Sequence, residues 1–185
     1  MAKIGLSNFY YAVNLTDAVA GATYDVPKKI PGLISADIKA GSTTSTLFAD
    51  NGPAEVASAL GDITVDIELK DLPLEVQSAL LGHKIVAGVM VNNANDVAPY
   101  VAVMFESLKS NGKKRFVKLL KGVFSEPDDT NKTKEDKVSF QTQKISGKFI
   151  IRDFDGDWKK TTDEDAEGYV PATGTNWYAA VEPVA

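Results

Sequence analysis

The sequence predicts a mainly β protein: a β-sandwich or barrel with one flanking α-helix and an extended hairpin arm. Three observations lead to this fold class. Residues 61–70 alternate polar and apolar side chains without a break, which is the period of a strand with one buried face. Residues 100–108 and 114–124 flank the turn signal Ser110-Asn111-Gly112 and predict a hairpin. The one clear helix signal covers about residues 72–81.

The alternating strands also predict which side chains face the core. In residues 61–70 the inward set is Ile63, Val65, Ile67 and Leu69, and the outward set is Asp62, Thr64, Asp66, Glu68 and Lys70. In residues 33–39 the inward set is Ile34, Ala36 and Ile38, and the outward set is Ser35, Asp37 and Lys39. Residues 137–152 are a further long strand candidate with a bend at Gly147. Asp155-Gly156 then predicts one more chain reversal.

The helix has signals at both ends. Asp71 is a candidate N-cap, Pro73 fits the first turn, and Gly82 can end the helix. A short apolar stripe for packing against a sheet consists of Leu72, Val76, Ala79 and Leu80. His83 follows directly, where its cationic form would lie favourably at the negative end of the helix dipole.

Residues 41–60 are not explained by a compact sandwich. This Ser- and Thr-rich stretch joins two firm strands, and Asn51-Gly52 near its middle is a hairpin turn signal. Residues 55–60 alone would also accept a helix, but we interpret the whole stretch as a projecting hairpin arm. Connections of this length inside compact domains are usually functional. Residues 125–137 are highly charged and predict an exposed loop.

The composition of the chain excludes several classes of functional site. A chain of 185 residues and 19.8 kDa fits one domain, residues 1–185, and can bury a substantial core. The absence of cysteine removes disulfides, thiolate metal sites and cysteine catalysis. A net charge of −5 argues weakly against adhesive binding to nucleic acid. The longest apolar run, residues 85–91, is far too short to span a membrane, and the N-terminal residues predict no secretion signal.

The motifs of common enzymes are missing. His83 is the only histidine, and no Gly-x-Ser-x-Gly elbow accompanies it, so a helix-end role is favoured over catalysis. No phosphate-binding loop and no dinucleotide fingerprint occur. We therefore expect a protein that is not an enzyme and that carries no cofactor.

One acidic run resembles a calcium loop. Asp153, Asp155, Asp157 and Glu164 have the spacing of positions 1, 3, 5 and 12 of that loop. Its glycine would stand at position 6, however, where this sequence has Trp158, and strand-like sequence precedes the run. An Asp-Gly turn on a solvated edge is the favoured interpretation, and we predict no tight calcium binding.

The strands themselves suggest self-association. Long strands with a fully polar second face leave edges that invite pairing with another chain. Repeated around a symmetry axis, such pairing closes a barrel and removes the edges. A monomeric sandwich with one wet face has the same periodicity, so both alternatives stand at this point.

Several segments form a recognisable set through their order and spacing. They are residues 5–12, 24–32, 47–52, 69–73 with 80–82, 99–107 with 109–113, 120–124, 140–142 and 145–147. Together they cover roughly residues 4–158 and resemble the major tail proteins of long-tailed, non-contractile bacteriophages. Residues 159–185 carry little of this signal.

The resemblance implies a phage tail-tube type of β-sandwich or barrel that forms hexameric rings, stacked into a tube for DNA ejection. The arm would contact a neighbouring ring. Partners would be other copies of the chain and the tape-measure, tail-terminator and distal tail proteins. DNA would pass without specific binding, and no membrane is involved. The protein would belong to the virion tail and be assembled in the bacterial host cytoplasm.

Two alternatives remain beside this interpretation. One is another ring-forming tube or tail-tip protein, because the same fold serves related assemblies. The other is a monomeric β-sandwich module that binds calcium or carbohydrate.

Two sets of residues are candidates for function within a tube. The resemblance implies a negatively charged channel, which would let DNA slide because it repels phosphate. The candidate lumen-facing residues are Asp37, Asp62, Asp66 and Glu68, with Lys39 and Lys70 partly offsetting their charge. The same face could instead look outward into solvent. The candidate inter-ring contacts of the arm are Leu47, Phe48, Asp50 and Asn51, with Leu47 and Phe48 as the apolar pair.

Overall fold

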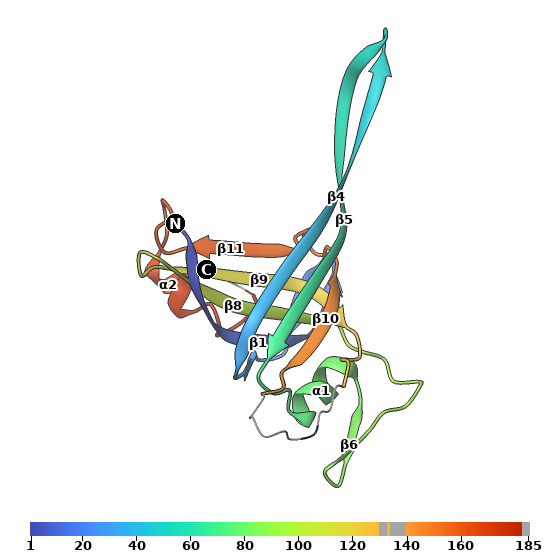
Figure 1. Ribbon diagram of the computed structural model, residues 1–185, viewed down its shortest axis with the longest axis vertical. Coiled ribbons are helices and arrows are strands. Elements are labelled where there is room, and N and C mark those ends of the chain that lie inside the picture. The colour runs from blue at the N-terminus through green and yellow to red at the C-terminus, as the bar shows by residue number, and fades with distance from the viewer. Residues whose placement is uncertain (130–132, 134–139, 183–185) are drawn as a thin grey trace.

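A computed structural model describes residues 1–129, 133 and 140–182 and shows a folded-over β-sheet with a long projecting hairpin (Figure 1). The strands are β1 (Lys3–Ala18), β2 (Gly21–Tyr24), β3 (Lys28–Ile30), β4 (Leu33–Ala49), β5 (Gly52–Leu69), β6 (Lys84–Val86), β7 (Val89–Val91), β8 (Val101–Lys109), β9 (Lys114–Phe124), β10 (Gln143–Phe149) and β11 (Lys159–Asp163). The helices are α1 (Leu74–Leu81) and α2 (Pro171–Thr175). The mainly β fold class is confirmed.

The described strands other than β6 and β7 form one antiparallel sheet that changes layer at β9. Its main path runs β2-β1-β8-β9-β10-β5-β4, while β3 pairs with β1. Residues 115–119 of β9 pair with β11, and residues 122–124 of the same strand pair with β10. Strands β10, β5 and β4 therefore cross over the layer formed by β1, β8, β9 and β11 (Figure 1).

The core lies between these two layers. The four inward residues predicted for β5 are all at most 2% exposed, whereas the polar residues between them remain accessible. They pack against Phe9 and Tyr11 of β1 and against alternate residues of β8 and β9. Helix α1 covers one end of the sandwich, where Leu72, Leu80 and Leu81 are buried. The predicted apolar stripe of the helix is thus confirmed.

A pair of glycines allows the sheet to turn between its layers. Gly122 of β9 lies under the Phe149 ring, so a Cβ atom at this position would overlap the ring. Gly147 of β10 faces Phe124 in the same way, with 2.9 Å between the position of a Cβ and the ring. The two rings pack edge to face with centroids 5.9 Å apart. Each glycine therefore makes room for the aromatic side chain of the opposite strand.

The predicted hairpin of residues 100–124 is confirmed as β8 and β9, with Gly112 in the left-handed region at φ 78°. The strand predicted for residues 137–152 is shorter in the structure: β10 covers Gln143–Phe149 and includes Gly147. Residues 137–139, and most of the loop predicted for 125–137, lie outside the described residues.

Two local predictions were wrong, and one helix was not predicted. Helix α1 begins at Leu74 with Pro73, not Asp71, in the N-cap position, and no side chain caps it. The Leu72 amide, which precedes the helix, donates to Gln143. Ile34, predicted to face the core, is 48% exposed, because the register shifts between Leu33 and Ser35 and Leu33 packs against the core in its place. The sequence also gave no signal for α2.

The corner between the layers leads to a first prediction. Gly122→Ala should lower the free energy of unfolding by about 1–3 kcal/mol, because the new methyl group overpacks against Phe149. Gly5→Ala is a matched control, because its methyl group would meet Leu108 at an ordinary 3.4 Å. Denaturant unfolding of both variants checks the effect. Adding Phe149→Leu to Gly122→Ala should recover part of the loss, and equal stability of the two alanine variants would contradict this packing.

Candidate functional site

The outer part of the β4–β5 hairpin, residues 41–60, projects away from the sandwich as an arm (Figure 1). Every residue in it except Gly52 is exposed. The two strands stay paired from Ser42 opposite Leu60 to Ala49 opposite Gly52. The extended hairpin predicted from sequence is therefore confirmed, and the helical alternative for residues 55–60 is excluded.

The arm ends in a two-residue turn formed by Asp50 and Asn51. Both have positive φ, at 51° and 63°, which is the requirement of the type I′ turn that suits the twist of a hairpin. Asp and Asn adopt this conformation more readily than most side chains. The turn was expected one residue later, at Asn51-Gly52, but Gly52 already belongs to β5.

The two sides of the arm differ in chemistry. Phe48, Val56 and Leu60 lie on one side of the ladder, and we call them the apolar face of the arm. Their exposed fractions are 69%, 66% and 48%. Leu47 lies on the other side, opposite Glu55, because consecutive residues of a strand point to opposite faces. Leu47 and Phe48 therefore cannot both contact one flat surface.

The four acidic residues proposed from sequence lie on one polar face of the β4-β5-β10 layer. Asp37 stands directly opposite Asp66 in the β4–β5 ladder. Asp62, Asp66 and Glu68 alternate with the buried residues of β5 and point away from the core. The structure therefore brings all four carboxylates together on this face.

Lysines from the neighbouring strands balance much of this charge. Lys39 lies 2.8 Å from Asp66, Lys148 3.4 Å from Asp62, and Lys144 3.9 Å from Glu68. The hydrogen bond from Lys39, together with one from Ser146, lowers the pKa of Asp66. Four carboxylates face three ammonium groups, so the polar face carries alternating charge with little net excess. Sequence reasoning named Lys39 but missed the two lysines of β10.

The C-terminal segment covers the second face of the β1-β8-β9 layer. Trp177 and Val181 are buried, and Tyr178 stacks on Tyr10 with centroids 4.6 Å apart. A second apolar cluster forms there with Ala12, Ala102, Met104 and Leu120. Sequence reasoning assigned no role to residues 159–185. The available signal was residues 101–105, an unbroken apolar run of the kind that is buried on both faces.

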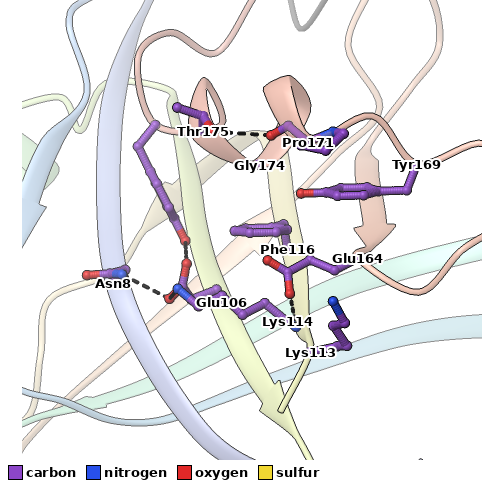
Figure 2. A pocket seen from close by; sticks show the side chains of 11 residues that line it. Asn8, Glu106, Lys113, Lys114, Phe116, Glu164, Tyr169, Pro171, Gly174 and Thr175 are labelled. Carbon is purple, nitrogen blue, oxygen red and sulfur yellow. Dashed lines mark hydrogen bonds and ion pairs between the residues drawn. The ribbon is translucent and has the colours of Figure 1, made fainter. Parts of the chain in front are cut away.

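A cleft of about 710 Å³ lies beside this segment (Figure 2). Its buried carboxylate, Glu106, accepts hydrogen bonds from Asn8 at 3.0 Å and Tyr178 at 3.1 Å, and Lys114 lies 2.8 Å away. Burial alone would raise the pKa of Glu106, but Lys114 and these donors outweigh it and lower the pKa. A carboxylate engaged in this way fixes the segment in place and is not available as a general base.

Lys118 is buried under the same segment. Its ammonium group donates to the Ala180 carbonyl at 2.9 Å and lies 4.6 Å from the centre of the Trp177 ring. Desolvation lowers the pKa of Lys118 to about 8. The ammonium group thus holds the end of the chain through a carbonyl and a cation–π contact.

His83 joins the end of α1 to two loops. Its Nδ1 lies 2.9 Å from Asp96, and its Nε2 contacts Glu126. The hydrogen bond to Asp96 raises the pKa of His83; burial opposes this shift, and Glu126 adds to it. The side chain is only 5% exposed, so this is a buried structural ion pair at the helix end, where the sequence had placed it.

The calcium-like run is held by cations. Asp155 accepts a hydrogen bond at 2.7 Å from the buried Arg152, whose guanidinium lowers the pKa of this carboxyl. Asp153 lies 3.1 Å from Lys121. Among the described residues, no group of three or more His, Cys, Asp or Glu is placed to hold a metal ion. No helix in the described part of the chain is long and apolar enough to cross a membrane.

The structure combines a mainly β fold with a projecting, largely exposed hairpin arm. Residues 22–171 match the family of the phage tail tube protein, and the chain belongs to this family. It is therefore a structural protein of the virion tail that self-assembles into a tube, and the family is not an enzyme family. No curated protein matches the chain.

The His83 contacts predict a pH-dependent stability. The raised pKa of His83 means that its contribution is complete below its unfolded value of 6.5 and is lost as pH rises through the folded pKa. The lowered pKa of Asp96 acts oppositely, so its contribution is lost only in acid. Unfolding between about pH 5 and 9 should show this loss, and His83→Gln should remove it. An NMR titration of the single imidazole that gave a pKa below 6.5 would contradict the assignment.

Proposed function

We propose that the chain forms hexameric rings that stack into the tail tube of a non-contractile phage, and that DNA is ejected through the channel. One observation carries this proposal: the tube family is combined with a hairpin arm in which every residue except Gly52 is exposed. The whole chain, residues 1–185, would act as one tube domain. Assembly would take place in the host cytoplasm, and tape-measure, tail-terminator and distal tail proteins would contact the finished tube.

The exposure of the arm supports a role between subunits. Phe48 and Val56 are each about two-thirds exposed, and side chains of this kind grouped on one surface are typical of interaction sites. In a tube, contact with a neighbouring ring would remove them from water. Burial of both side chains contributes roughly 3–6 kcal/mol at each arm before ordering costs.

The free edge of the sheet supports contacts within a ring. Strand β4 ends the main strand order, so among the described residues nothing pairs with its outer edge over Leu33–Lys39. An unpaired edge of this length favours pairing with another chain. Repetition of that pairing around an axis would close the β4-β5-β10 layers into a continuous barrel.

The polar face of that layer would then line the channel. Three of its four carboxylates are matched by lysines at 2.8 to 3.9 Å, so the wall would present little net charge to a phosphate backbone. A wall that offers no excess of cations releases few counterions on contact with DNA. Passage without tight binding follows from this balance.

The arm provides one test. Deletion of residues 44–53 should leave a folded, soluble subunit that forms no tubes, because the deleted residues are exposed and make no core contact. Negative-stain imaging of the concentrated protein checks the result, and thermal unfolding confirms the fold. Normal tubes from the deletion variant would refute a role for the arm in assembly.

The polar face provides a second test. Replacing Asp62, Asp66 and Glu68 by lysine should permit folding, since exposed ion pairs contribute only about 0–1 kcal/mol each. It should slow DNA ejection, most strongly at low salt. The matched control replaces three exposed acids elsewhere: Asp71, Asp157 and Glu167. Virions with the first triple change that eject DNA at the normal rate at low salt would place the polar face outside the channel.

A further inference from the structure

The sandwich is not closed along one side. A cleft of about 590 Å³ lies between β4 and the layer of β1, β8, β9 and β11. Its lining includes Leu6, Ala36 and Ile38, which also pack against the core. Ile34 lines the cleft as well and is 48% exposed. The cleft therefore leaves core-type apolar surface open to solvent.

The rim of this cleft carries more cations than anions. Lys3, Arg115 and Lys159 line it together with one carboxylate, Asp37. Arg115 is paired with Asp163, but no described carboxylate pairs with Lys3 or Lys159. Desolvation, with repulsion from Lys3 and then Arg115, lowers the pKa of Lys159. An anionic group entering the cleft would relieve this repulsion, whereas a neutral apolar segment would not.

The arm has the complementary chemistry. Asp50 and Glu55 are the only charged residues between Ala40 and Gly61, so the arm is purely anionic. Phe48 and Val56 lie on one side of the tip and Glu55 on the other, with Asp50 in the turn between the strands, so a cleft that encloses the tip would meet both kinds of side chain. A tip with two carboxylates and two large apolar side chains matches a cleft with apolar lining residues and unpaired lysines.

We propose that this cleft receives the arm tip, residues 46–56, of a second copy of the chain. The inference rests on the proposed function, because it names the surface that the arm contacts. The arm extends away from the body that carries its own cleft (Figure 1), so the occupant is a different molecule. A contact between two different surfaces is heterologous and repeats without closing as a dimer, as a growing tube requires.

Cysteine cross-linking of full-length chains tests the contact directly, since the protein contains no cysteine. Ala49→Cys at the arm tip and Thr161→Cys in the cleft are both exposed and change no charge. A mixture of the two variants should yield a disulfide-linked dimer under mild oxidation. The control mixture replaces Thr161→Cys with Val89→Cys, on the exposed β6–β7 hairpin.

Charge exchange tests the chemistry of the contact. Lys3→Glu with Lys159→Glu in the cleft-cysteine chain should reduce the yield roughly tenfold, because like charges then meet. Asp50→Lys with Glu55→Lys in the arm-cysteine chain should restore it. Lys84→Glu, on the β6–β7 hairpin, is the control and should leave the yield unchanged.

The outcomes separate the two proposals. A Thr161 cross-link above the control, weakened and restored by charge as described, supports the cleft as the docking site. Equal or higher yield with Val89→Cys, or sensitivity to Lys84→Glu alone, would overturn it in favour of the β6–β7 hairpin. Imaging of the unmodified protein is read independently: tubes without the Thr161 cross-link refute only the cleft, and the cross-link without tubes refutes only the stacked rings.

Discussion

The core-facing side chains of β5 between Ile63 and Leu69 have to be shielded from water, and this requirement determines the rest of the sandwich. Four consecutive inward side chains, from Ile63 to Leu69, are at most 2% exposed, and removing them from water contributes several kcal/mol. The facing layer can cover them only if the sheet changes direction, which it does where Gly122 admits the Phe149 ring. The outward side of the same strand consequently becomes the polar face.

The opposite layer has to be covered on both faces, because β8 and β9 carry apolar side chains on both sides. One side packs into the main core, and the C-terminal segment covers the other with Trp177 and Val181. Buried ions at Glu106 and Lys118 fix that segment through specific hydrogen bonds. By contrast, among residues 1–129, 133 and 140–182 no segment covers the exposed apolar side chains of the arm in this way.

The sequence predicted what depends on local pattern. The alternation of β5, the β8–β9 hairpin, the stripe of α1 and the existence of the arm all follow from periods of two or 3.6 residues and from turn residues. Prediction from the sequence failed where segments that are distant in the chain come into contact. Lys144 and Lys148 reach the acids of β5 only through the β5–β10 pairing, and the exposure of Ile34 depends on an irregular register that periodicity does not encode. The four acids do lie on one face, as expected, and the offset by Lys39 was expected too, but the contribution of Lys144 and Lys148 was not.

The root of the arm at Gly41 and Gly61, here called its neck, affects how stiffly the arm is attached to the sandwich. At its root Gly41 and Gly61 face each other across the hairpin, where the ladder shifts register. No side chains brace the two strands at this level, so stiffness there depends on the backbone alone. In a stack of rings joined by their arms, these glycine necks would act as compliant joints. A long tail could then bend under load while each arm tip stays in contact with its neighbouring subunit.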